Sequence, residues 1–367
     1  MEEPKIGIGP TGLGAALIQF VFFAVVGIIV CVYWIPEEHI VLKIIPATLL
    51  MLVALACLAI LGDNWPLAPP GGTWWNPERS RLVAGIGMTI IWIIFTFAQL
   101  LFMRFVYPRW PMGPMYLWFG VIAFWLTLLY AINWNGWPFK GRLHPWGTMA
   151  ATYIIIMVLT VIIWNLLTNL DGTPFANTPM NHKGPWNVNW LTGYLVWCIA
   201  WFFVFNPIFV TQGWPFGSWG HPGMAVGQTI FAHILGYICW NGSLALGYSP
   251  TFSFGAVASS IIFWSLLYSW HFGFWGTTRF TFFQRAWRSF IIVIVLSAIW
   301  IIIMELVLRP VAAGIAAKKL PADINILIIY VNLCIVGPAL IPHNAFYLRW
   351  PLTLPTPPGT PPPDQAA

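Results

Sequence analysis

The sequence predicts an all-α, polytopic integral membrane protein of about ten transmembrane helices, arranged as five tandem parallel two-helix repeats. Three observations predict this fold. Hydrophobic residues make up 59% of the 367-residue chain and charged residues only 7%, with a mean hydropathy of +0.78. Soluble domains carry about 25% charged residues, so this chain has too few charged residues to form the water-exposed surface of a soluble protein. Long apolar stretches recur along the chain, and a Trp-Pro motif or a degenerate copy follows every second one.

The apolar stretches give the expected helices in order. A membrane-spanning helix needs about 20 predominantly apolar residues. Ten stretches qualify, and proline and glycine gather between them. We expect the spans at 14–35, 41–62, 82–106, 115–133, 148–168, 190–210, 225–247, 254–273, 286–308 and 324–345.

The Trp-Pro motif sets the length of the repeat. Its five tryptophans are 72, 77, 61 and 75 residues apart, an interval that holds two spans and their loops. A proline stops the helix, and a tryptophan anchors its end at the membrane interface, so each repeat is expected to end in a WP[FL]-type turn. A ring of tryptophans around an entrance is the alternative. The motifs are Trp65-Pro66-Leu67, Trp137-Pro138-Phe139, Trp214-Pro215-Phe216, the degenerate Trp275-Gly276-Thr277, and Trp350-Pro351-Leu352.

The second and third copies agree at further positions. A His-Pro pair follows each tryptophan at the same spacing, at His144 and at His221. Such agreement indicates duplication. We expect one transmembrane domain over residues 1–350, with repeats at about 14–67, 82–139, 148–216, 225–277 and 286–352. The seven prolines of residues 351–367 predict a disordered tail.

An even number of spans per repeat gives every copy the same orientation. All Trp-Pro turns should therefore lie on the N-terminal face of the membrane, around a closed ring or along a curved stack. We count nine Lys and Arg residues on that face and seven on the other. Lys and Arg residues are enriched in the cytoplasmic loops of membrane proteins. This small excess therefore favours a multi-pass protein of the cell inner membrane with its N-terminus and Trp-Pro turns in the cytoplasm.

The sequence lacks the motifs that are typical of several classes of enzyme and nucleotide-binding protein. The sequence has no GxxxxGK[ST] motif, no HExxH motif and no glycine-rich dinucleotide loop after a strand. The net charge of +6 is scattered, so no nucleic-acid partner is expected. The five cysteines form no CxxC pair. We therefore do not expect the chain to be an enzyme by itself.

Polar residues within apolar stretches are the candidates for a transport path or ligand site. Polar groups at membrane depth are costly and mark functional sites by default, although many only bond helices together. Glu305 has Arg309 four residues later, a spacing that suits an ion pair near a helix end. The candidates are His233, His271, Glu305, Asn165 and Asn241.

The histidines also allow cofactor hypotheses. His233 and His271 lie on consecutive spans, toward the same half of the bilayer, and such a pair can ligate haem b. His144 and His221 occupy equivalent loops and are weak metal candidates, because no cysteine or carboxylate cluster accompanies them. Helix capping and packing remain the structural alternatives for all four residues.

These observations favour an integral membrane transporter or channel-like facilitator for a small solute, neutral or weakly charged. The alternatives are a membrane subunit of a redox complex that binds haem or quinone, and a membrane scaffold subunit. The expected partners are the lipid bilayer, the small solute, and other membrane subunits or further copies of the chain.

Overall fold

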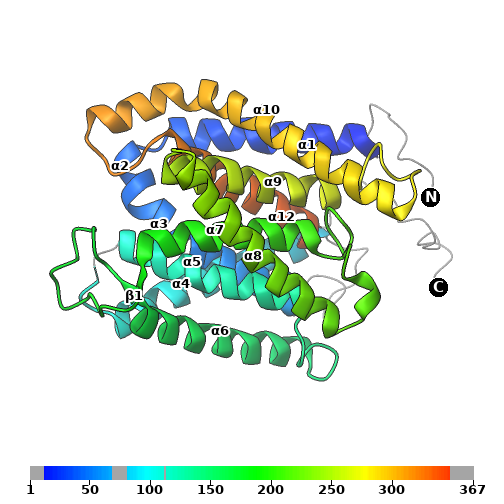
Figure 1. Ribbon diagram of the computed structural model, residues 1–367, viewed down its shortest axis with the longest axis horizontal. Helices are drawn as coiled ribbons and strands as arrows, with labels where there is room; N and C mark the ends of the chain where they lie inside the picture. Colours follow the sequence, from blue (N-terminus) through cyan, green and yellow to red (C-terminus); the bar gives the residue numbers. More distant parts are fainter. Residues whose placement is uncertain (1–11, 68–80, 111–112, 348–367) are drawn as a thin grey trace.

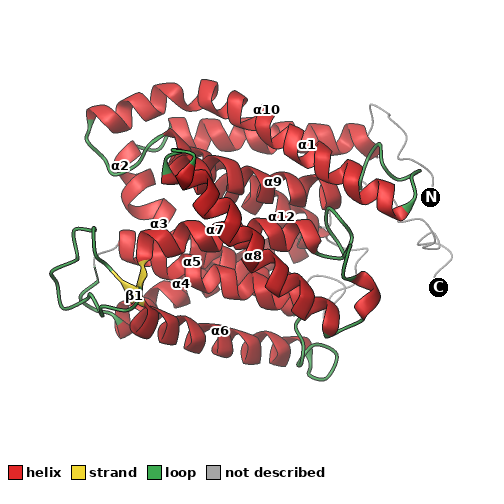
Figure 2. Cartoon of the chain, viewed as in Figure 1, coloured by secondary structure: helices red, strands yellow, loops and turns green. Residues whose placement is uncertain are grey.

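The computed structural model describes residues 12–67, 81–110 and 113–347, and this part of the chain is almost entirely helical (Figure 1, Figure 2). The fifth motif at Trp350 and the predicted tail 351–367 lie outside the described residues. The helices are α1 (Gly12–Ile28), α2 (Glu37–His39), α3 (Ile45–Ala56), α4 (Arg81–Val106), α5 (Pro114–Leu128), α6 (Pro145–Leu167), α7 (Val188–Phe205), α8 (Gly223–Ala245), α9 (Ser259–Leu266), α10 (Phe282–Ala317), α11 (Ile324–Tyr330) and α12 (Gly337–Ala345).

Wider π-helical turns extend several of these helices into longer rods. The short helix η5 (Gly217–Trp219) is instead a 3₁₀ turn in a loop. The π-helical segments are η1 (Ile29–Tyr33), η2 (Ile40–Ile44), η3 (Cys57–Leu61), η4 (Leu129–Asn133), η6 (Thr251–Ala258), η7 (Leu267–His271) and η8 (Val331–Val336).

Nine rods in the described part of the chain are long and apolar enough to cross a membrane. The sequence predicts ten, and the difference is α8, a helix of 23 residues that is more polar than the rest. Gln228, His233 and Asn241 lie along it and lower its hydropathy. A helix therefore forms where the seventh span is predicted, but it is not among the nine.

The rods fall into an inner and an outer set by burial. In the rods built on α3, α5, α7, α9 and α11, between 61% and 78% of the most apolar 18-residue segment of each rod is buried within the protein. In those built on α1, α4, α6 and α10, only 17% to 33% is buried. Inner and outer rods alternate along the chain when α8, which lies between the inner rods of α7 and α9, is counted with the outer set. Large apolar side chains on the outer rods, such as Phe97 and Ile154, face outward, as lipid contact requires.

The inner rods close into a ring. α3 packs against α5, α5 against α7, α7 against α9 and η6, η6 against α11, and η8 back against α3. Each outer helix covers the inner rod that precedes it in sequence: α4 lies on α3, α6 on α5, α8 on α7 and α10 on α9. The first helix, α1, instead contacts η8 and α12, the last inner rod. The described elements thus form a closed ring rather than a curved stack.

The turns at one end of the ring, which we call the Trp-Pro end, share a local conformation (Figure 1, right). Two residues with positive φ precede each described motif tryptophan: Asp63-Asn64, Asn135-Gly136, Gln212-Gly213 and Gly273-Phe274. The Trp-Pro bonds at 65–66, 137–138 and 214–215 are cis.

Neighbouring Trp-Pro turns also contact one another. Lys140 Nζ lies 2.9 Å from Asp63 Oδ1, so an ion pair joins the first turn to the second. The His144 ring lies edge-on to Trp65 at 5.8 Å, and the His221 ring lies 6.3 Å from Trp137. Each histidine therefore packs against the tryptophan of the preceding copy.

The opposite end, which we call the mouth end, holds the N-terminal ends of the inner rods (Figure 1, left). Two short strands, β1 (Thr168–Asn169) and β2 (Trp186–Asn187), pair in parallel and close the loop between α6 and α7 (Figure 2). Within that loop Lys183 Nζ lies 3.0 Å from Asp171 Oδ1. Hydrogen bonds from Lys183 and Asn181 hold the pKa of Asp171 below its usual value.

Candidate functional site

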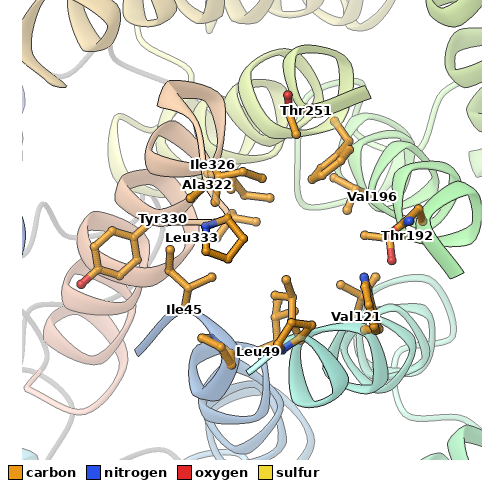
Figure 3. Close-up of a pocket in the computed structure, with 18 of the residues that line it drawn as sticks. Ile45, Leu49, Val121, Thr192, Val196, Thr251, Ala322, Ile326, Tyr330 and Leu333 are labelled. Atoms are coloured by element: carbon orange, nitrogen blue, oxygen red, sulfur yellow. The ribbon is translucent and has the colours of Figure 1, made fainter. Parts of the chain in front are cut away.

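A cavity of about 670 Å³ lies on the axis of the ring, and all five inner rods contribute to its wall (Figure 3). Ile45 and Leu49 come from the α3 rod, Val121 from α5, Val196 from α7 and Leu333 from the α11 rod. Residues four positions apart lie on one face of a helix, which is why Ile45 and Leu49 both face inward. Ligand sites of drug-sized molecules have similar volumes, about 300–1,000 Å³.

The polar groups of the wall gather at the mouth end. Thr251 donates a hydrogen bond from Oγ1 to Asp323 Oδ2 at 2.5 Å. Asp323 Oδ1 caps α11, accepting from the backbone N–H groups of Asn325 at 2.9 Å and Ile326 at 3.0 Å. Thr192 donates to the Val188 carbonyl oxygen at 2.8 Å. Asp323, the one carboxylate among the described residues of the lining, therefore already has hydrogen-bond donors on both oxygens.

No lysine, arginine or histidine occurs among the described residues that line the cavity. Tyr330 is part of the lining, but its ring points away from the cavity (Figure 3), and its hydroxyl donates to the Cys31 carbonyl oxygen at 3.3 Å. The interior surface is thus apolar, and the Asp323 carboxylate and the threonine hydroxyl groups lie near the mouth.

The cavity occupies only part of the length of the ring. Its lining reaches Leu49 in the α3 rod, although that rod continues to Leu61, and it reaches Ile199 in α7, which continues to Phe205. Beyond these residues the inner rods carry large buried side chains such as Leu55, Leu128 and Phe203. We call the part that contains the cavity the cavity half, and the part from there to the Trp-Pro end the closed half.

A buried amide side chain joins three helical elements around the cavity half. Asn332, on η8, accepts a hydrogen bond from Trp300 Nε1 of α10 at 2.7 Å. Its Nδ2 donates to the Ser259 and Ser260 hydroxyls of α9 at 2.9 and 3.1 Å. Asn332 is fully buried and its amide is bonded on both sides, so it joins two inner rods and one outer helix.

A second polar network lies in the closed half, where α1 packs on the outside of the last inner rod. His271 Nε2 donates to the Ala16 carbonyl oxygen at 2.8 Å, and Asn344 Nδ2 lies 3.4 Å from His271 Nδ1. Gln19 Nε2 donates to Asn344 Oδ1 at 3.5 Å and also bonds His343 Nδ1. The network of Ala16, Gln19, His271, His343 and Asn344, which we call the latch, joins α1 to η7 and α12.

The five predicted path residues lie outside the cavity lining. His271 belongs to the latch. His233, on α8, bonds the Thr229 carbonyl oxygen through Nδ1 at 2.6 Å and packs edge-on against Trp125. The two predicted haem ligands contact different helices: His233 contacts α5 and α7, whereas His271 contacts α1 and α12.

The remaining path candidates lie near the ends of helices or between them. Asn241 accepts from Trp190 Nε1 at 3.2 Å and donates to the Tyr237 carbonyl oxygen at 2.9 Å. Asn165 donates to the Tyr107 hydroxyl at 3.4 Å. Glu305 is partly exposed on α10, and within the described ranges no ion pair joins it to Arg309.

The predicted metal candidates are on separate loops. His144 and His221 each pack against a tryptophan, as described above, and not against each other. Among the residues that the structure describes, no group of three or more His, Cys, Asp or Glu side chains could hold a metal ion.

The residues that form the cavity are absent from the sequence-based candidates. Asp323 carried a usable signal, because an acidic residue directly before an apolar stretch is a typical helix N-cap. The wall residues carried none. In the inner rods every side is apolar, so periodicity does not distinguish a cavity-facing valine from one that packs in the core.

Comparisons with known proteins add no assignment. The chain matches no protein-family model, no curated protein and no solved structure.

Proposed function

We propose that the protein is a membrane transporter or channel-like facilitator for a small uncharged solute, which enters the central cavity from the mouth end. The observation that carries this proposal is the ring of inner rods around a cavity of about 670 Å³. A wall of helices satisfies its own backbone hydrogen bonds and separates the solute from lipid, as a path across a bilayer requires.

The closed half makes the proposed path a gated one. Because the lining stops at Leu49 and Ile199, a solute in the cavity meets packed side chains before it reaches the Trp-Pro end. Passage therefore requires the inner rods to separate there. The latch holds α1 against two inner rods in this half, so we propose that it opens or loosens during transport.

The five-repeat architecture is part of the same proposal. The shared conformation of the turns before Trp65, Trp137, Trp214 and Trp275 supports duplication of a two-helix unit. The regular placement of each outer helix on the preceding inner rod also supports it. A cytoplasmic Trp-Pro end, and roles for His233, Glu305, Asn165 and Asn241 in the path, stay predictions.

Filling the cavity tests the proposal. Val196→Trp adds a large side chain to the wall and leaves the closed half intact. We would reconstitute the protein in liposomes and measure the entry of a homologous series of amides, from acetamide to hexanamide, by stopped-flow light scattering. We expect protein-dependent entry of at least one amide, reduced about fivefold or more by Val196→Trp because the path is obstructed.

The matched control is Val158→Trp, the same substitution on the outward face of α6, where the side chain is 52% exposed. It should leave entry unchanged. Entry equal to that of empty liposomes for every amide would overturn the proposal, and so would equal loss in both variants.

A further inference from the structure

The lining of the cavity narrows the chemistry of its ligand. An ionic solute would lose its hydration on entry, and an isolated charge pays a large penalty in an apolar site. No basic side chain is available in the described lining to pair with an anion. The Asp323 carboxylate is occupied by Thr251 and by the first turn of α11, so it does not offer an inorganic cation a free ligand.

Strongly polar neutral molecules are also excluded from the depth of the cavity. A sugar or an amino acid would have to exchange its hydrogen bonds to water for partners in the wall. Leu49, Val121, Val196 and Leu333 supply none. Each unsatisfied donor or acceptor would cost about 1–3 kcal/mol, so such solutes would bind poorly.

The wall is polar only near the mouth. Thr251 and Asp323 lie at the start of their rods, and Thr192 lies near the start of α7. Figure 3 shows Thr192 and Thr251 on the rim of the same opening that Val121 and Val196 face. Each threonine hydroxyl donates to a protein oxygen and keeps lone-pair capacity to accept from a ligand, although Thr251 Oγ1 also lies 3.4 Å from Ser249 Oγ, which can donate to it.

We infer that the cavity binds a neutral, predominantly apolar molecule of drug-like size, with its hydrogen-bonding end at the mouth. This inference rests on the proposed function, because it assigns the solute class of the same cavity. The volume of about 670 Å³ suits a compact lipophile or a single short chain.

Binding of a matched pair of dyes tests the charge requirement. N-phenyl-1-naphthylamine is neutral, and 8-anilino-1-naphthalenesulfonate has the same ring skeleton with an added sulfonate. We would titrate each dye into the full chain in lipid nanodiscs, with empty nanodiscs subtracted, and follow energy transfer from tryptophan. We expect saturable binding of the neutral dye and about tenfold or weaker binding of the sulfonate.

Two variants that fill the cavity from different helices keep the test informative if one of them fails to fold. Val196→Trp and Val121→Trp should each weaken binding of the neutral dye about tenfold, whereas Val158→Trp on the outward face should not change it. Decanol should displace the dye better than decane, because only the alcohol has a polar end for the mouth.

Each result decides the inference. Equal binding of the two dyes, or binding that neither filling variant weakens, overturns the ligand class. Equal displacement by decane and decanol overturns the placement of the polar end. Amide entry that Val196→Trp blocks, without binding of the neutral dye, overturns this inference and leaves the proposed function standing. Binding of the neutral dye without amide entry overturns the proposed function and leaves the assignment of the ligand class standing.

Discussion

The two halves of the inner ring have similar composition but differ in packing. In the cavity half, Leu49 and Val196 border an open space, whereas in the closed half Leu55 and Leu58 are surrounded by other side chains. Leu49 and Leu55 even belong to the same helix, α3. Apolar side chains alone therefore do not fill the interior of a ring.

The largest expected effect comes from making one substitution in both halves. Leu55→Ala removes packed methyl groups and leaves a void, which should lower the free energy of unfolding by about 2–5 kcal/mol. Leu49→Ala should cost about 1 kcal/mol, because the side chain already lacks neighbours on its cavity side. Reversible unfolding in bicelles on addition of SDS measures both values. Equal losses would show that the cavity half is packed as tightly as the closed half.

The next effect concerns how the closed half is held. Asn344→Leu breaks the bonds from Asn344 to His271 and Gln19 while preserving approximate volume. Interhelical hydrogen bonds in membranes contribute about 0.6 kcal/mol on average and at most about 1.7. We expect a loss of about 1 kcal/mol in the same unfolding assay, together with faster amide entry, because α1 is less firmly attached.

Asn325→Leu is a suitable control for that experiment, because it changes a partly exposed amide at the mouth end, away from the latch. It should leave the rate of amide entry unchanged. If Asn344→Leu lowers stability but leaves entry as in the wild type, the latch only supports the fold and the gate lies elsewhere.

The smallest expected effect concerns the Asp171–Lys183 ion pair, in the loop at the mouth end. The Asp171–Lys183 ion pair holds the loop that supplies Pro174 and Phe175 to the cavity lining. Because the pKa of Asp171 is lower in the folded protein, its contribution is complete above the unfolded pKa of about 3.9 and is lost as pH falls through the folded value. The pair is exposed, so the effect on global stability should be minor.

Hydrogen exchange in residues 168–187 checks this expectation. The wild type should protect the loop at pH 7 and lose part of that protection near pH 3, whereas Asp171→Asn should show the reduced level at both values. Identical protection in the two proteins at pH 7 would mean that the pair does not hold the loop.

The sequence predicted the helices well because the signal is local. A stretch of about 20 apolar residues is sufficient evidence for a span, and the stretch 41–62 corresponds to Glu37–Leu61 in the structure. The prediction was least accurate where composition was mixed. Residues 225–247 correspond to α8, whose polar residues keep it out of the membrane-competent set, and residues 286–308 are part of a longer helix, Phe282–Ala317.

The cavity could not be predicted, for two physical reasons. Which rods are inner depends on contacts between distant segments, such as η8 with α3, and no local pattern encodes them. The search for a path also favoured polar residues at membrane depth. Asn241 and His271 instead bond helices to one another, and the described cavity is lined mainly by residues such as Val121 and Val196.

The contact of α1 with η8 and α12 also bears on how the protein is made. Helices enter the membrane in the order of synthesis, so α1 is inserted well before residues 324–345, its partners in the ring, leave the ribosome. Until then Gln19 lacks the His343 and Asn344 side chains that it bonds in the folded state, although His271, the partner of the Ala16 carbonyl group, has already been made. Of the described helices, α1 is therefore made early but packed late, and a chain arrested before α11 lacks the η8 and α12 surfaces against which α1 packs.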